Sequence, residues 1–461
     1  MSEKGGLDDE FTKRPRCRKS IAKALISSAF LLTVLGALFH PRSPCYHRFG
    51  HGSSHLRPLS IEDRVHNILS DTPLIDGHND LAILIRGLYG NHIYDKNFTE
   101  PFTKGGMAYH TDLPRLRQGQ NGGAFWSVFA PCPANGTDYS DENYAASVQF
   151  TLEQIDVITR LQAAYPDSFS GIVDSGSARA AFAQGKLISP LGVEGLHQIG
   201  NSAANLRRFH ALGVRYATLT HNCGNVFADA ALWESPFRKA PAFWGGVSPR
   251  GRRLIAEMNR IGMIVDLSHV SVDTMVDVLG GREDGEWAGS KAPIMFSHSS
   301  AYALCPHPRN VPDHVLELVK KRNSVVMINF APDFVSCVDN NNPNGVPDFY
   351  PPNSTLSHVA DHVTYIGDLI GYDHVGLGSD FDGIQSTPEG LGDVSKYPDL
   401  VAELLRRGVS DADAAKVVGA NILRVWADVE KVAAKLQSQG APVMEDDLRG
   451  IFREGVLTAD M

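Results

Sequence analysis

The chain has 461 residues, with 43 Lys and Arg against 52 Asp and Glu, a formal net charge of -9, and 43% hydrophobic residues. This composition allows a large buried core and excludes collagen-like, coiled-coil and disordered proteins. The mild acidity and the absence of a basic stripe with interleaved aromatic residues argue against nucleic-acid binding.

A basic cluster precedes an uncharged run near the amino terminus. The run extends from Ala24 to Phe39 and is slightly shorter than the roughly 20 residues that cross a bilayer. Because basic residues favour the cytosolic side, we predict a cytosolic tail at residues 1–20 and an uncleaved signal anchor at 21–40. A linker at 41–60 would follow, giving a type II membrane protein whose remainder is lumenal or extracellular. Secretion after signal cleavage is the alternative.

Three N-glycosylation sequons agree with that orientation. They begin at Asn97, Asn135 and Asn353, each close to turn-forming residues. Glycosylation at these positions is expected if this part of the chain enters the secretory pathway.

From residue 60 onward, short apolar runs alternate with amphipathic stretches, a pattern typical of parallel α/β proteins. The predicted strands are Leu74 to Asp80, Gly123 to Phe129, Ile188 to Glu194, Val214 to His221, Met263 to His269, Pro293 to His298, Ser324 to Phe330, and His374 to Asp380. The predicted helices include Glu142 to Ala164, Ser202 to Leu212, Pro249 to Arg260, Pro312 to Lys321, Ser357 to Ile370, Asp399 to Arg407, and Asp411 to Trp426. Eight such units predict a (β/α)8 TIM barrel over residues 61–430, followed by a C-terminal extension at 431–461.

Polar residues recur at the carboxyl ends of the predicted strands. They are His78, Asp80, Glu194, His221, His269, His298 and Asp380. A barrel buries its strands, so a charge or an imidazole there requires a reason. The carboxyl ends are also where TIM-barrel active sites are built.

His78 and Asp80 are two residues apart, so on a strand both side chains would point to one face. Alone, such a pair can be a turn with a capping Asp. Together with Glu194, His269 and His298 it forms a donor set that suits Zn²⁺ or a similar ion. These ligands exceed the needs of one zinc, and a bridging carboxylate between two ions would use them all. Other histidines are expected to be structural; they are His92, His110, His197, His210, His307, His358, His362 and His374.

Several segments together resemble the renal (membrane) dipeptidase family of zinc peptidases. They are Ile75-Asp76-Gly77-His78-Asn79-Asp80, Gly192-Val193-Glu194-Gly195, Leu219-Thr220-His221, Asp266-Leu267-Ser268-His269-Val270-Ser271, Phe296-Ser297-His298-Ser299-Ser300-Ala301-Tyr302, Arg309-Asn310-Val311-Pro312-Asp313 and Gly378-Ser379-Asp380-Phe381-Asp382-Gly383. The family fold is a metal-dependent-hydrolase TIM barrel, consistent with the predicted strands.

The resemblance implies a role for each matching residue. His78 and Asp80 would bind one zinc, His269 and His298 the other, and Glu194 would bridge them. A water activated by the two ions would attack the scissile carbonyl. His221 would contact the substrate, Arg309 would pair with its terminal carboxylate, and Asp380 would recognise the amino end and carry the proton to the leaving amine. The residues alone do not choose between Asp380 and Asp382; the family pattern selects Asp380.

The resemblance also implies two disulfides, Cys132 to Cys223 and Cys305 to Cys337; two pairs of buried thiols are the alternative. No Cys follows Cys337, so a covalent dimer is not expected, although a noncovalent homodimer is compatible with the sequence. The expected function is hydrolysis of a broad range of dipeptides by a dizinc enzyme. The alternatives are a related amidohydrolase specialised for Cys-Gly conjugates and an inactive barrel that serves as a binding module.

Overall fold

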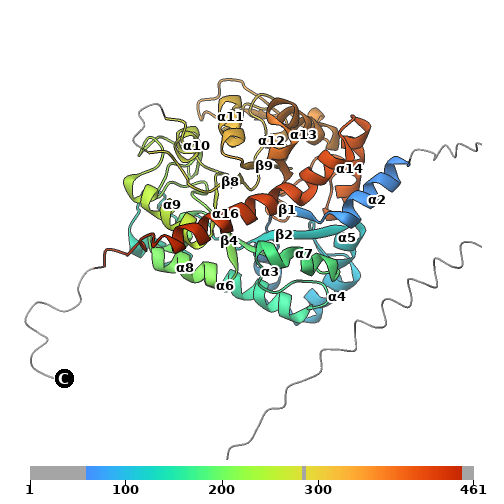
Figure 1. The fold of residues 1–461 in the computed structure, drawn as a ribbon, viewed down its shortest axis with the longest axis horizontal. Helices are drawn as coiled ribbons and strands as arrows, with labels where there is room; N and C mark the ends of the chain where they lie inside the picture. Colours follow the sequence, from blue (N-terminus) through green and yellow to red (C-terminus); the bar gives the residue numbers. More distant parts are fainter. Residues whose placement is uncertain (1–58, 283–286, 449–461) are drawn as a thin grey trace, which may run out of the picture. The chain divides into compact units, whose positions relative to one another are not determined.

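The computed structural model describes residues 59–282 and 287–448 (Figure 1). The predicted tail, anchor and most of the linker lie outside the described residues. Eight parallel strands form one sheet in the order β1-β2-β3-β4-β7-β8-β9-β12. The strands are β1 (Leu74–Asn79), β2 (Asn121–Ser127), β3 (Leu191–Glu194), β4 (Val214–Thr218), β7 (Ile264–Asp266), β8 (Ile294–Phe296), β9 (Val325–Ile328) and β12 (Val375–Leu377).

The sheet curves back on itself just beyond its first and last strands. Asn79 forms a parallel bridge with Phe381. The backbone N–H of Asp80 donates to the carbonyl of Phe381 at 2.8 Å, and that of Asp380 donates to the carbonyl of His78 at 3.1 Å. These bonds join the ends of β1 and β12 and nearly close the barrel. The predicted eight-stranded α/β barrel is therefore confirmed.

Helices surround the strands, and two short hairpins extend from the loops. The helices are α2 (Ile61–Asp71), α3 (Leu81–Tyr89), α4 (Lys96–Lys104), α5 (Leu113–Gln118), α6 (Asp141–Ala164), α7 (Ser175–Ala183), α8 (Ala203–Ala211), α9 (Pro249–Ile261), α10 (Val272–Leu279), α11 (Asp313–Lys321), α12 (Pro332–Val335), α13 (Leu356–Ile370), α14 (Tyr397–Arg406), α15 (Asp411–Ala415) and α16 (Asn421–Ser438). The hairpins pair β5 (Leu232–Glu234) with β6 (Phe237–Lys239), and β10 (Cys337–Val338) with β11 (Asp348–Phe349).

The predicted elements differ from the observed ones mainly at their ends. Most predicted strands are longer than the observed ones, so His221, His269 and His298 lie in the loops after β4, β7 and β8. The strand predicted from Leu74 ends at Asn79, because Asp80 leaves the strand and becomes the N-cap residue of α3, with φ -96° and ψ 29°. The helix predicted from Asp411 to Trp426 is interrupted by a π-helical turn at Lys416–Ala420. A Cβ at Gly419 would lie 2.0 Å from the carbonyl oxygen of Pro73, so this turn passes close to the start of β1.

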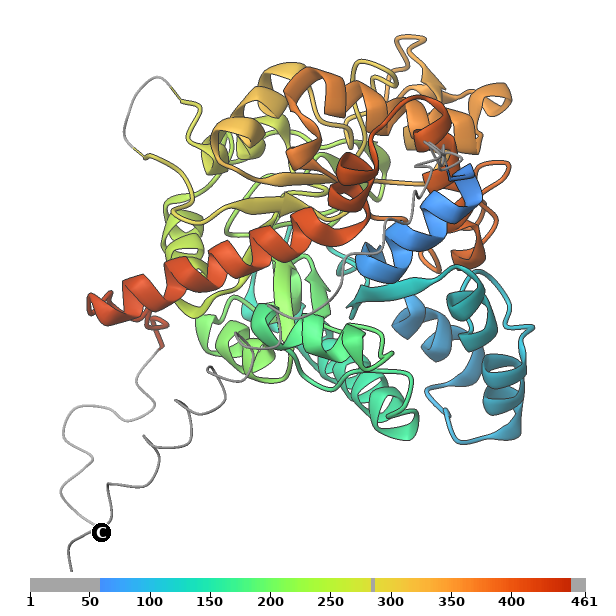
Figure 2. The same ribbon diagram turned by 45° about the vertical axis from the view of Figure 1, so that its right-hand side comes forward.

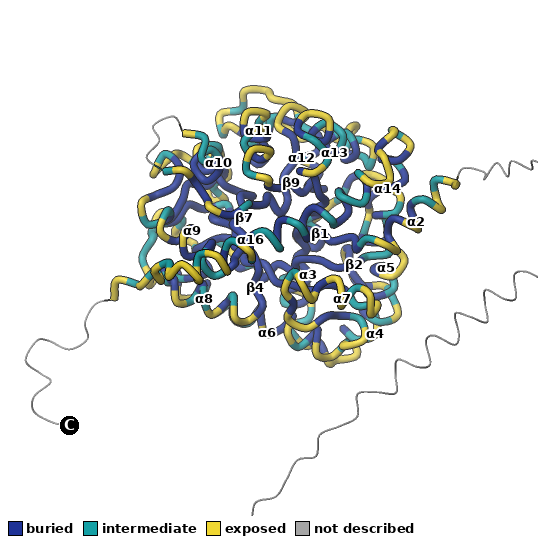
Figure 3. The backbone as a smooth tube through the Cα atoms, viewed as in Figure 1, coloured by how far each residue is buried: buried dark blue, intermediate teal, exposed yellow. Residues whose placement is uncertain are grey.

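Helix α16 closes the amino-terminal end of the barrel (Figures 1 and 2). Its Trp426 is fully buried and packs in one cluster with Phe125, Ile264 and Met295 from the barrel interior. Figure 3 shows the strands buried and the outer faces of many helices exposed. Because this end is filled by side chains, the polar residues at the opposite, carboxyl end have access to solvent from one side only. The predicted boundary between the barrel and the C-terminal extension falls inside α16.

Within the described ranges 59–282 and 287–448, no helix combines the length and apolar character needed to cross a membrane. The predicted anchor at 21–40 lies outside these ranges.

Replacing Trp426 with Ala should lower the free energy of unfolding by about 3–5 kcal/mol, because it leaves a large cavity beneath the barrel. Equilibrium urea denaturation measures this change. Phe237→Ala is the matched control, since Phe237 is 53% exposed and its loss should change the free energy by less than about 0.5 kcal/mol. Equal effects of the two variants would contradict the assigned role of α16.

Candidate metal centre and active site

Five side chains from four parts of the sheet meet at the carboxyl end of the barrel. His78 lies in β1 and Asp80 directly follows it, Glu194 ends β3, and His269 and His298 lie in the loops after β7 and β8. All five are buried, with exposures of 6% or less. Asp80 is the N-cap residue of α3 and does not lie on the strand. Its carboxylate is nevertheless close to the His78 ring.

The five residues form two groups that share Glu194. In the first, His78 Nε2 is 3.0 Å from an Asp80 oxygen and 3.5 Å from Glu194 Oε2. In the second, Glu194 Oε1 is 3.0 Å from His269 Nε2 and 3.4 Å from His298 Nε2. Each carboxylate oxygen of Glu194 therefore faces a different group.

Two observations indicate that these donors fit cations. The Nε2 atoms of His269 and His298 are only 2.9 Å apart and both face Glu194. Asp80 Oδ1 is buried and has no hydrogen-bond partner among the described residues. Buried carboxylates and converging imidazole nitrogens are costly without a partner, whereas a borderline ion such as Zn²⁺ binds both ligand types.

The second ring nitrogen of each histidine has its own partner. His298 Nδ1 is 2.8 Å from Ser297 Oγ, which donates to Asp266 at 2.7 Å. His269 Nδ1 is 2.9 Å from the Asn222 side-chain oxygen. His78 Nδ1 is 2.7 Å from the Tyr216 hydroxyl. Contacts of this kind hold Nε2 toward a metal.

A cavity of about 580 Å³ opens at this end of the barrel, and three of the five residues, Asp80, Glu194 and His269, line it. Arg309 lines it and is almost fully buried, and burial lowers the pKa of its guanidinium to about 10. Its Nη2 donates to the carbonyl of His298 at 3.3 Å, and the guanidinium carbon lies 4.9 Å from the centre of the Phe334 ring. Its Nε and Nη1 have no partner among the described residues. Two buried donors are therefore available to an anion in the cavity.

The structure distinguishes Asp380 from Asp382, although both line the cavity and both have positive φ values. One oxygen of Asp382 accepts from the backbone N–H of His110 at 2.8 Å, and the N–H of Asp382 donates to His110 Nδ1 at 2.9 Å. Asp380 instead lies close to His78 and His298, with the possible ligand atoms of the three side chains within 4.8 Å of one another. Burial raises the pKa of Asp380 to about 7. Asp380 is thus the carboxyl group beside the predicted metal ligands.

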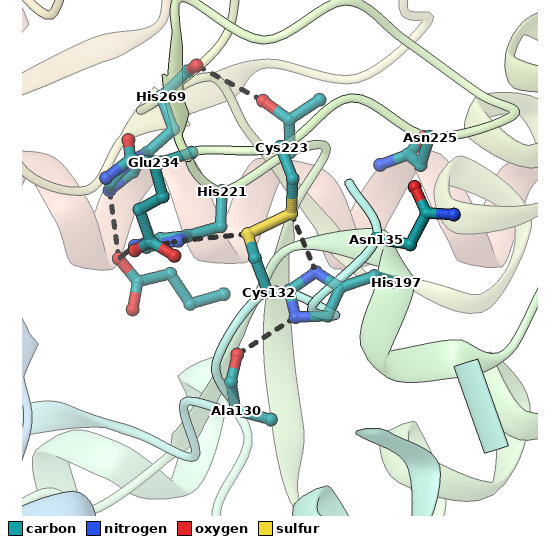
Figure 4. Close-up of a disulfide and its surroundings, with 12 residues drawn as sticks. Ala130, Cys132, Asn135, His197, His221, Cys223, Asn225, Glu234 and His269 are labelled. Atoms are coloured by element: carbon teal, nitrogen blue, oxygen red, sulfur yellow. Dashed lines mark hydrogen bonds and ion pairs between the residues drawn. A yellow bond between two sulfur atoms is a disulfide. The ribbon is translucent and has the colours of Figure 1, made fainter. Parts of the chain in front are cut away.

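His221 lies between the candidate metal centre and a disulfide (Figure 4). Its Nε2 is 3.9 Å from Glu194, and its Nδ1 is 3.5 Å from the sulfur of Cys132, which is bonded to Cys223. Burial lowers the pKa of His221 well below its usual value. Cys305 and Cys337 form a second disulfide. Both implied pairings are present in the structure.

The sequence reasoning missed several residues of the site. Tyr216 lies within an apolar strand and Ser297 within a segment that resembles the family, and neither pattern marks the residue as part of the site. Glu234, in the β5–β6 hairpin, lines the cavity with an oxygen 3.8 Å from His221 Nδ1. No periodicity or spacing in the sequence connects this hairpin with the strand ends.

The three sequon asparagines, Asn97, Asn135 and Asn353, are exposed. Asn97 lies in α4 and Asn353 in a 3-10 turn at Pro351–Asn353. Glycosylation itself stays a prediction.

Similarity to known proteins identifies the family of this chain. The family model described as membrane dipeptidase (peptidase family M19) matches residues 62–440. Dipeptidase aclJ of Aspergillus oryzae is 46% identical over 391 residues, which cover 84% of each chain. Dipeptidase tcpJ of Claviceps purpurea is 45% identical over 381 residues, covering 83% of this chain and 82% of that protein. The chain belongs to the membrane dipeptidase family.

A solved structure shows the same fold. The metallopeptidase of Rhodobacter sphaeroides, bound to a phosphinate mimic of the dipeptide L-Ala-D-Ala, aligns with a TM-score of 0.63 and 25% identity, over 78% of this chain and 99% of that one. The chain is therefore a dipeptide-hydrolysing enzyme of a metallopeptidase family, and the predicted resemblance is confirmed.

His362 illustrates the histidines expected to be structural. It is buried, its Nδ1 accepts from the backbone N–H of Ala301 at 3.0 Å, and its Nε2 lies 2.9 Å from the carbonyl oxygen of Val335. In the neutral ring, both nitrogens therefore have a hydrogen-bond partner. Burial lowers the pKa of His362 to about 4.

This depressed pKa predicts a pH-dependent contribution to stability. The contribution is fully present above the unfolded pKa of about 6.5 and is lost as pH falls toward 4, a change of about 3 kcal/mol. In His362→Gln the free energy of unfolding should therefore depend less steeply on pH between 6.5 and 4. Urea denaturation at stepped pH measures the slope, with the exposed His92→Gln as control. Equal slopes in wild type and His362→Gln would contradict the assignment.

Proposed function

We propose that the chain is a dizinc dipeptidase that hydrolyses the peptide bond of a broad range of dipeptides. The observation that carries this proposal is the pair of ligand groups that share Glu194, beside a cavity lined by Arg309. The Nε and Nη1 atoms of this buried arginine have no partner among the described residues. The metallopeptidase family and the phosphinate-bound relative support it.

His78 and Asp80 would hold one zinc ion, His269 and His298 the other, and Glu194 both. Two ions held in this way would lower the pKa of a water nucleophile toward neutrality and neutralise the charge that develops on the scissile carbonyl oxygen. The protein itself would shield the metal-binding side chains from bulk water and hold them in the required orientation. Their burial and the partners of the outer ring nitrogens serve that purpose.

Arg309 and Asp380 would orient the substrate. The unpartnered Nε and Nη1 of Arg309 match the two oxygens of a terminal carboxylate, a geometry that suits a planar guanidinium. Asp380 would bind the amino end. Its carboxyl group lies beside His78 and His298, where it could carry a proton to the leaving amine. His221, beside Glu194, would steady the tetrahedral intermediate.

We further propose that residues 21–40 anchor the enzyme as a type II membrane protein, with the barrel on the lumenal or extracellular side. The basic cluster before the uncharged run supports this orientation, and the two disulfides suit an oxidising compartment.

A dipeptide panel tests the proposed function. Purified enzyme is assayed on free dipeptides, amino-blocked dipeptides, tripeptides and S-substituted Cys-Gly conjugates, before and after chelation and after zinc is restored. We expect zinc-dependent cleavage of many free dipeptides and little cleavage of the blocked or longer peptides. Cleavage confined to the conjugates would replace broad specificity with conjugate hydrolysis. Activity that survives complete chelation would contradict the metal mechanism.

Arg309→Lys should keep the positive charge but lose the paired donors. The value of kcat/KM for dipeptides with a free carboxylate should fall about 10- to 100-fold, equivalent to about 1.4–2.8 kcal/mol, the range of a charged hydrogen bond. Carboxyl-amidated analogues, assayed alongside, should be affected much less. An equal fall on both substrate series would show that Arg309 does not recognise the carboxylate.

A further inference from the structure

Tyr216 is a buried polar residue that none of the proposed catalytic steps uses. It lies in β4 with its side chain fully buried inside the barrel. Its ring centre is 5.6 Å from that of Phe125, which is itself 5.6 Å from that of Trp426. Its hydroxyl lies 2.7 Å from His78 Nδ1. A column of aromatic side chains therefore connects the closed end of the barrel to a candidate metal ligand.

The backbone of the neighbouring strand makes room for this phenol. Gly192 in β3 is the register partner of Tyr216. A Cβ at Gly192 would lie 2.1 Å from Tyr216 Cζ and 2.5 Å from its hydroxyl oxygen, so any side chain there would collide with the ring. The position of the hydroxyl is thus set by two adjacent strands rather than by a mobile loop.

The direction of the hydrogen bond between Tyr216 and His78 decides what His78 can do. His78 Nε2 faces the carboxylates of Asp80 and Glu194. To bind an ion there, Nε2 must present its lone pair, so the proton of the neutral ring must be on Nδ1. The Tyr216 oxygen is the hydrogen-bond partner that the structure places at Nδ1. If the phenol donated instead, the proton would be on Nε2 and would block the ion.

We propose that Tyr216 is a positioning residue for the metal centre, which accepts the Nδ1–H of His78 and so keeps Nε2 available to the ion shared with Asp80 and Glu194. This inference rests on the two-ion centre proposed above. It assigns Tyr216 to one ion only. In the other group, the Nδ1 atoms of His298 and His269 contact Ser297 and Asn222 instead.

The test is a zinc titration of metal-free protein in competition with a chromophoric chelator, which reports affinity without any assay of activity. Wild type should show two binding steps. Tyr216→Phe should weaken one of them by about 10- to 100-fold, the usual effect of losing a ligand's hydrogen-bond partner. The other step and the thermal midpoint of the metal-free protein should stay close to wild type.

Two further variants make the result specific. Tyr144 is also buried, and its hydroxyl has no partner among the described residues, so Tyr144→Phe removes an equivalent oxygen and should leave both steps unchanged. Ser297→Ala should weaken the step that Tyr216→Phe spares, because Ser297 contacts His298.

The outcomes separate this inference from the function on which it rests. Fewer than two zinc steps in wild type would overturn both the centre and the inference. Two wild-type steps that Tyr216→Phe leaves unchanged would overturn the inference alone, as would equal weakening of both steps with a lower midpoint for the metal-free protein. If Tyr216→Phe fails to fold, nitrogen NMR of metal-free wild type decides, at a pH where the His78 ring is neutral and with His78→Asn to identify the signal. A proton on Nδ1 of His78 supports the inference, and a proton on Nε2 overturns it.

Discussion

The shared carboxylate of Glu194 is the constraint on which the rest of the site depends. Its two oxygens face separate groups, each with an imidazole from a different strand. Burial removes these carboxylates and ring nitrogens from water, which is costly, so the arrangement is stable only with a cation or with protons held there. A barrel suits this requirement because its parallel strands all deliver their carboxyl ends to the same place.

Two buried aspartates beneath the site hold those strand ends together. Asp76 in β1 accepts from the hydroxyls of Ser379 and Tyr397, which follow β12. Asp266 in β7 accepts from Thr218 in β4 and from Ser297 after β8. Burial raises the pKa of Asp76, while its hydrogen bonds oppose the shift. The Asp76 bonds join β1 to the segment after β12, and the Asp266 bonds join β7 to its neighbours β4 and β8. The two carboxylates therefore hold together the strand ends that carry the candidate ligands.

The sequence predicts the eight strands, although not their ends, because each strand depends on a local pattern. It also selects the five residues that meet at the carboxyl end of the barrel, and their role as metal ligands stays a prediction. Each apolar run is short and bounded, and each ends near a polar residue. It predicts the geometry of Asp80 wrongly, since alternation along a strand cannot show that the chain turns into a helix there. It cannot find Tyr216, because a tyrosine in an apolar strand looks like core until its partner on β1 is known. The disulfide pairings came from the family resemblance, since spacing alone leaves them open. The choice of Asp380 over Asp382 becomes a physical one only when His110 is seen to hold Asp382.

The partners of the three histidines also make the two candidate ion positions unequal. His298 is connected through Ser297 to the Asp266 carboxylate, whereas His78 rests on a neutral phenol. A carboxylate behind an imidazole makes the ring a more basic ligand than a neutral acceptor does. The group of His269 and His298 therefore has the more electron-rich nitrogen donor, while the group of His78 has the additional charge of Asp80. An ion held by His269 and His298 would depend more on imidazole basicity, and an ion held by His78 and Asp80 more on carboxylate charge. The affinities for the two ions would therefore fall at different pH values as the solution is acidified.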